Sequence, residues 1–450
     1  MKQMTARLGE EKISKLLLNL SVPATVGMFV NALYNLVDTI FVGRGVGAIA
    51  IGGLTVAFPI QMVIMAFAMM IGIGAASAIS RSLGEKNIER ADYVAGNSFL
   101  CVIISSAIIS TLGLIFTEPI LRIFGSTETI LPYAKDYITI ILWGSIFFSF
   151  GMSSNNLIRA EGNAKVAMAT MLIGAILNII LDPIFIFIFK LGVKGAALAT
   201  IISQFISFLY ILTYLYSGKS SLKIKLHHLK PKINIIKEIF AVGSAAFSRQ
   251  ISGSVVAIVV NNSLRVFGGD IALIIVGILH RVTMFVFMPL FGVIQGMQPI
   301  VGFNYGAKKL DRVKEAVKLS LITTIVIATF GWLIIEFFPF TVISMFTRDA
   351  EIVEKGSSIM RIVISMIPII GIQIVGAALF QSLGKAVPSL ILSLLRQVLL
   401  FIPLVIILPR VLSLGLLGIW IAYPAADILS VTLTALFLRS ELKKMSLSMW

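Results

Sequence analysis

The chain has little cysteine and little acidic charge, and it lacks the short motifs of common enzymes. Cys101 is the only cysteine in 450 residues and lies in an apolar run, which excludes a disulfide framework and a thiolate metal site. The sequence contains no Gly-rich phosphate-binding loop, no His-Glu-x-x-His metal helix and no Gly-x-Ser-x-Gly nucleophile turn. We therefore expect no enzymatic activity, no use of ATP, no cofactor and no structural metal.

Apolar residues dominate what is present. They make up 58% of the sequence against 13% charged residues, and the mean hydropathy is +1.00, a balance typical of helical membrane proteins. A membrane crossing takes about 20 apolar residues. Twelve stretches of that kind lie near residues 16–42, 54–80, 93–116, 133–156, 164–189, 193–216, 237–264, 272–302, 316–338, 352–379, 386–408 and 414–438. The sequence predicts an all-α polytopic membrane protein whose first span is retained, because the first run is too long for a signal peptide.

The positive charge is concentrated in alternate connections. Lys and Arg total 37 against 21 Asp and Glu, a formal net charge of +16. With twelve spans, most of these basic residues, Arg159 among them, fall in the even-numbered connections and the two termini. The positive-inside rule then places both termini in the cytoplasm of a multi-pass inner (plasma) membrane protein. We expect the basic charge to contact anionic lipid headgroups and not nucleic acid.

The two halves of the sequence repeat each other. The segment GEKNIER at residues 84–90 matches GAKKLDR at residues 306–312, a shift of 222 residues, and the same shift pairs Gly162 with Gly384. Six is an even number of spans, so the second half re-enters from the same side as the first. The sequence predicts two six-helix lobes related by a parallel repeat, with a pathway between them.

The repeat defines three regions. We expect an N-lobe at residues 1–218 with helices 1–6 and the ion site, a basic cytoplasmic linker at residues 219–236, and a C-lobe at residues 237–450 with helices 7–12. The linker is rich in lysine and contains Pro231. It is long enough to let the lobes rock against each other.

The stretch NIILDP at residues 178–183 is the strongest functional signal. It lies inside an apolar run, where an unpartnered carboxylate costs several kcal/mol. Asn178 shares a helix face with Asp182, and Pro183 predicts a bend at the acid. Asp182 is predicted to be a proton or cation site, with an interhelical hydrogen-bond anchor as the alternative.

Other polar side chains interrupt the apolar spans of the first half. The first span carries a stripe with spacings of three, four and seven, the fourth span ends in two amides, and the sixth contains a hydroxyl, a set made up of Asn31, Tyr34, Asn35, Asp38, Asn155, Asn156 and Thr200. With Asn178 and Asp182 they form an all-oxygen set, which suits a proton, Na⁺ or another hard cation. If Asp38 and Asp182 are close, they should titrate as a unit.

The second half lacks these carboxylates. It places three arginines, Arg249, Arg281 and Arg396, in apolar spans together with one acid, Asp427. We expect these four to be buried, with Arg396 and Asp427 pairing across neighbouring spans. A functional charged cluster is the alternative.

Four motifs resemble those of the multidrug and toxic compound extrusion (MATE) transporters: LVDTIFVG at residues 36–43, LIRAEGN at 157–163, NIILDP at 178–183 and GVKGAALAT at 192–200. The resemblance runs from about residue 16 to residue 438. The acids of the first lobe resemble the DinF-like branch. This resemblance implies a proton or Na⁺ site at Asp38, Asn178, Asp182 and Thr200, lined by Tyr34 and Asn155, with Asn31, Asn35 and Asn156 nearby.

The function expected from these observations is secondary active antiport. The chain would export amphipathic organic cations in exchange for H⁺ or Na⁺ by alternating access, as a monomer surrounded by lipid. The arginines of the second half keep open a flippase or exporter of lipid-linked or glycan precursors. A membrane scaffold without transport is the third possibility.

Overall fold

The computed structural model describes residues 2–411 and 414–447, and within them the chain is helical with no strand. Twelve helical segments in this part are long and apolar enough to cross a membrane, which confirms the predicted number. The first six lie in α2 (Ile13–Gly45), α3 (Ala48–Gly84), α4 (Ile88–Ile115), α6 (Leu131–Ala160), α7 (Ala164–Pro183) with η1 (Ile184–Ile188), and α8 (Val193–Tyr216). The other six lie in α9 (Ile233–Phe267), α10 (Gly269–Gly306), α11 (Leu310–Phe337), α13 (Ala350–Ile364) with η3 (Ile367–Ile369) and α14 (Ile370–Ser382), α15 (Ala386–Leu394) with η4 (Leu395–Phe401) and α16 (Ile402–Ile407), and α17 (Gly415–Leu447). Short helices α1 (Lys2–Glu10), α5 (Thr117–Ile123), η2 (Leu226–Leu229) and α12 (Pro339–Ser344) lie between them.

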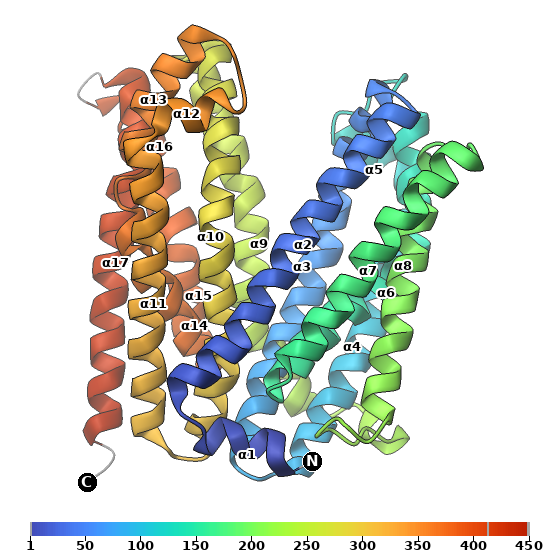
Figure 1. The fold of residues 1–450 in the computed structure, drawn as a ribbon, viewed down its shortest axis with the longest axis vertical. Helices are drawn as coiled ribbons and strands as arrows, with labels where there is room; N and C mark the ends of the chain where they lie inside the picture. Colours follow the sequence, from blue (N-terminus) through green and yellow to red (C-terminus); the bar gives the residue numbers. More distant parts are fainter. Residues whose placement is uncertain (1, 412–413, 448–450) are drawn as a thin grey trace.

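The helices form two lobes that converge toward the end carrying both termini and diverge toward the opposite end (Figure 1). The buried apolar residues are shared between the lobes at the converging end and divided between them elsewhere. One buried cluster includes Leu16, Ile79, Val301 and Leu379, so both lobes contribute to it. Away from that end each lobe has a separate cluster of its own. The predicted arrangement of two six-helix lobes is therefore present, and the V is held together at one end only.

Glycines at equivalent positions of the repeat allow the lobes to touch. A Cβ on Gly84 would lie 2.0 Å from the backbone oxygen of Phe303 on α10. A Cβ on Gly306 would lie 2.1 Å from the backbone oxygen of Arg81 on α3. Because both distances are far below van der Waals contact, only glycine permits this reciprocal approach of the two helix ends.

The type of helix changes at Pro183, where the sequence predicts a bend. Pro183 supplies no N–H, so the α-helical hydrogen bonding of α7 stops there and the chain continues as the π-helix η1. Phe189 N donates to Ile184 O at 2.9 Å at the end of this turn. Asp182 therefore lies at the junction between two types of helix, where the backbone geometry differs from that of the preceding span.

The segment between the lobes is held against the first lobe by hydrogen bonds to α4. Asp92 on α4 accepts a hydrogen bond from Lys223 N at 2.7 Å. Asn97, also on α4, accepts one from Lys232 N at 2.8 Å and donates to the backbone oxygens of His228 and Lys230 at 3.2 Å. Helix α9 begins at Ile233, inside the stretch predicted as linker, because Ile235 is buried in the shared core.

Glu161 holds the start of the same segment. This carboxylate is fully buried and accepts hydrogen bonds from Tyr214 Oη at 2.7 Å, Ser220 Oγ at 2.9 Å and Ser221 N at 2.6 Å. Burial raises the pKa of Glu161, and its hydrogen bonds partly oppose that rise. The Lys-rich segment is thus a strap on the first lobe and not a free tether.

Candidate functional site

Asp38 and Asp182 meet inside the first lobe. Asp38 lies on α2 and Asp182 at the end of α7, and their carboxyl groups contact each other directly. Their exposed fractions are 7% and 0%. Two ionised carboxylates repel each other strongly in a low-dielectric site, so this contact requires a shared proton or a cation.

Asn178 and Thr200 complete the group predicted from the sequence. Asn178 Nδ2 donates to Asp182 Oδ1 at 3.4 Å and to Thr200 Oγ1 at 3.3 Å. Thr200 Oγ1 in turn donates to Ala196 O at 3.0 Å, which fixes the direction of its lone pairs. The four side chains come from α2, α7 and α8, so the site depends on the packing of three helices.

This group has more acceptors than donors. Three buried side-chain oxygens have no hydrogen-bond partner: Asp38 Oδ1, Asp182 Oδ2 and Asn178 Oδ1. Leaving such atoms unpartnered costs about 1–3 kcal/mol each, and more for charged groups. A proton or an oxygen-binding cation would satisfy them. No cluster of three His, Cys, Asp or Glu side chains in the described residues could hold a transition metal.

A cavity of about 480 Å³, part of it open to solvent, adjoins the acids. Asp38, Tyr34, Asn35 and Thr200 line it, as do four polar residues that the sequence analysis did not select: Gln61, Tyr137, Ser145 and Gln204. Gln61 and Ser145 are single polar residues within apolar runs, which was the available signal for them. Tyr137 and Gln204 lie next to other polar residues.

The remaining predicted residues of the first lobe lie elsewhere. Asn31 is exposed and does not line the cavity. Asn155 Nδ2 donates to Ala167 O at 2.7 Å and to Thr170 Oγ1 at 2.6 Å, so it joins α6 to α7. Asn156 lines a second cavity, between the lobes.

The second lobe brings only two of its four predicted charges together. Arg396, in η4, donates a hydrogen bond to Asp427 on α17, as expected for that pair. Arg281, on α10, is exposed, so its predicted burial is wrong. Arg249 is half-buried on α9. The four residues do not form one cluster of ion pairs.

Comparison with known proteins identifies the architecture. The MatE family profile matches residues 23–184 and, a second time, residues 246–407, which are the two halves of the repeat. This chain belongs to the MATE family. It is therefore a multi-pass membrane protein of a family of transporters and not of enzymes, and it matches the DinF-like branch.

Known MATE proteins cover nearly the whole chain. The multidrug export protein MepA of Staphylococcus haemolyticus is 28% identical over 405 residues, covering 90% of this chain and 89% of that protein. A solved structure of the MATE multidrug transporter DinF-BH is 45% identical, has a TM-score of 0.89 and covers 98% of each chain. An outward-facing MATE transporter of the MOP superfamily is 28% identical with a TM-score of 0.91 and the same coverage. The chain is thus a MATE-type multidrug efflux transporter.

Proposed function

We propose that this transporter exports amphipathic organic cations in exchange for H⁺ or Na⁺ through the Asp38–Asp182 pair. The observation that carries the proposal is the direct contact of two buried carboxyl groups beside a cavity between helices of the first lobe. A cationic substrate and a coupling ion compete for the same negative charge, and such competition is sufficient for exchange.

The change from α-helix to π-helix at Pro183 supports a mechanical role for the same charge. When a proton or Na⁺ leaves, the two carboxylates repel each other, and this repulsion favours separation of α2 from the end of α7. When an ion returns, the helices can close again. Two helix arrangements biased by one ion are what alternating access requires.

The distribution of basic residues supports an orientation in the membrane. We infer that both termini face the cytoplasm, that the V opens to the other side, and that the protein acts as a monomer in the inner membrane. Of the alternatives, flipping of lipid-linked precursors would need a cationic cavity in the second lobe. The Arg396–Asp427 ion pair and the exposure of Arg281 do not supply one.

Reconstituted vesicles test the exchange. Purified protein in proteoliposomes should accumulate or release a fluorescent cation such as ethidium when an H⁺ gradient or a Na⁺ gradient is imposed separately. Asp38→Asn should remove the response to whichever gradient drives the wild type. Asp270→Asn, which removes an exposed acid at the start of α10, is the matched control. Wild-type flux from Asp38→Asn would refute the mechanism.

A further inference from the structure

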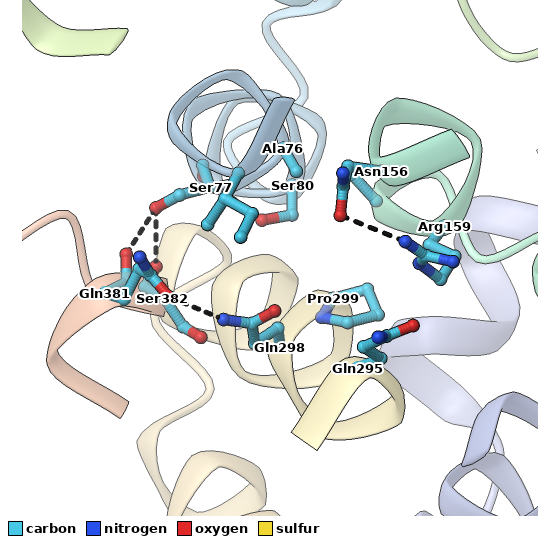
Figure 2. A pocket seen from close by; sticks show the side chains of 12 residues that line it. Ala76, Ser77, Ser80, Asn156, Arg159, Gln295, Gln298, Pro299, Gln381 and Ser382 are labelled. Atoms are coloured by element: carbon cyan, nitrogen blue, oxygen red, sulfur yellow. Dashed lines mark hydrogen bonds between the residues drawn. The ribbon is translucent and has the colours of Figure 1, made fainter. Parts of the chain in front are cut away.

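A second cavity lies between the two lobes at the end where they meet. About 340 Å³ between its walls is free of protein atoms, part of it open solvent, and residues from four helices line it: Ser77 and Ser80 of α3, Asn156 and Arg159 of α6, Gln295 and Gln298 of α10, and Gln381 and Ser382 of α14 (Figure 2). Two of these helices belong to each lobe. None of the cavity-lining residues is acidic.

Arg159 gives this cavity an uncompensated positive charge. Arg159, which the sequence places near an even-numbered connection, lies in the last turn of α6, and its exposed fraction is 8%. Its guanidinium donates to Asn155 Oδ1 and, at 3.0 Å, to Asn156 Oδ1, which are neutral acceptors. No carboxylate lies within ion-pair distance of it in the described residues. An arginine has five N–H donors, so donors remain for a ligand.

Gln381 adds an unused donor from the other lobe. Its exposed fraction is 3%, and its Oε1 accepts a hydrogen bond from Gln298 Nε2 at 2.9 Å, which orients the amide. Its own Nε2 has no partner. A buried amide nitrogen without an acceptor is costly, and it can only be satisfied by a lone pair. The cavity thus contains one permanent cation and surplus donors.

We propose that this cavity binds a small inorganic anion through Arg159, with the free amide of Gln381 as a second donor on the opposite side of the same cavity (Figure 2). Helices of both lobes line the cavity, so its shape depends on how the lobes meet. An anion binds there more weakly when α6 has moved away from α10, and it therefore stabilises the converged end of the V. This inference does not depend on which ion drives transport.

Thermal unfolding of the purified full-length protein in detergent tests the site. The unfolding temperature is followed while sodium chloride replaces sodium gluconate at constant Na⁺ and constant ionic strength, so that cation binding at Asp182 contributes no difference. The wild type should be stabilised by chloride in a saturable manner. Arg159→Gln should raise the half-saturating chloride concentration at least about tenfold, since it removes the charge-assisted hydrogen bonds.

Two further variants separate binding from folding. Gln381→Leu removes the donor of the second lobe but keeps the charge, and it should weaken the chloride response severalfold. Lys165→Gln removes an exposed positive charge near the start of α7 and should respond like the wild type. A saturable response in Arg159→Gln equal to that of the wild type would overturn the proposal, as would a response lost equally in Lys165→Gln. If chloride does not stabilise the wild type, the cavity is not an anion site.

Discussion

The two polar cavities of this transporter are opposite in character. The cavity beside Asp38 and Asp182 lies within one lobe and has buried oxygens without donors. The cavity beside Arg159 and Gln381 lies between the lobes and contains one buried donor without an acceptor, Gln381 Nε2, and an arginine without an acidic partner in the described residues. The first set of atoms suits a cation or a proton, and the second suits an anion.

Buried charges in the two lobes differ in whether an opposite charge lies beside them. Arg396 and Asp427 in the second lobe neutralise each other, and such a pair needs no ligand. The Asp38–Asp182 pair and Arg159 have no such internal counterion. Uncompensated charge, and not burial alone, distinguishes the two candidate sites from structural ion pairs.

The largest effect is expected from removing the fully buried acid. Asp182→Asn should lower gradient-driven efflux about a hundredfold, because loss of an ionisable partner in a low-dielectric site is worth several kcal/mol. The initial rate of cation flux in proteoliposomes measures it. Its chloride response in thermal unfolding should stay at the wild-type level, since the two cavities are separate. Loss of both properties together would show that the cavities form one site.

The next largest effect is expected at the close contact between Gly306 of α10 and the backbone of α3. Gly306→Leu would place a Cβ 2.1 Å from Arg81 O, a rigid backbone atom. We expect a loss of about 1–3 kcal/mol in the free energy of unfolding and separation of α3 from α10. Maleimide labelling of a Ser80→Cys reporter, with Cys101 replaced by Ala, should become faster.

Gly277→Leu is the matched control for that variant, because it lies on the same helix and a Cβ there meets no atom within 4 Å. It should leave the labelling rate of the reporter unchanged. Equal labelling in the two leucine variants would mean that the glycine contact does not hold the lobes together.

A smaller effect on transport is expected from removing the hydroxyl group of Thr200, which lines the first cavity. Thr200→Val keeps the shape of the side chain but removes the acceptor of Asn178 Nδ2. One net hydrogen bond is worth about 0.5–1.5 kcal/mol. The concentration of driving ion that gives half-maximal flux should therefore rise several-fold. Thr213→Val, on the exposed face of the same helix α8, should not change it.

The smallest effect is expected on the pH dependence of stability, through Glu161, a near neighbour of Arg159 in the sequence. Burial raises the pKa of Glu161, so the folded protein binds a proton there at a pH where the unfolded chain has released it. The free energy of unfolding should therefore fall as pH rises from the ordinary glutamate value through the raised pKa. Glu161→Gln should remove this contribution to the pH dependence of the unfolding temperature.

The chloride response of Glu161→Gln should match that of the wild type. Glu161 faces Tyr214 and the strap, and it makes no ion pair with Arg159. A stronger chloride response in this variant would show that Glu161 neutralises Arg159, and the contrast between the two cavities would then need revision.

Much of the architecture could be predicted from the sequence, because membrane helices are long, apolar and separated by polar connections. The shift between residues 84 and 306 predicted the repeat. In the structure, each of these two glycines packs against the backbone of the helix that carries the other. Asp182 was also identifiable, since a carboxylate in an apolar run is rare.

The contacts between distant residues could not be read from the sequence. The meeting of Asp38 and Asp182 depends on how α2 packs on α7, which no local pattern records. Gln61 was missed because it is a single polar residue with no periodic partner. The burial of Arg159 depends on tertiary packing, since it lines a cavity together with residues of α3 and α10.

The strap has a mechanical consequence for the whole molecule. Its backbone is attached to α4 as far as Lys232, and α9 starts at the next residue, so no slack remains between the two arms. A movement of the second lobe relative to the first is therefore expected to bend the first turn of α9 or to break the hydrogen bonds of Asn97.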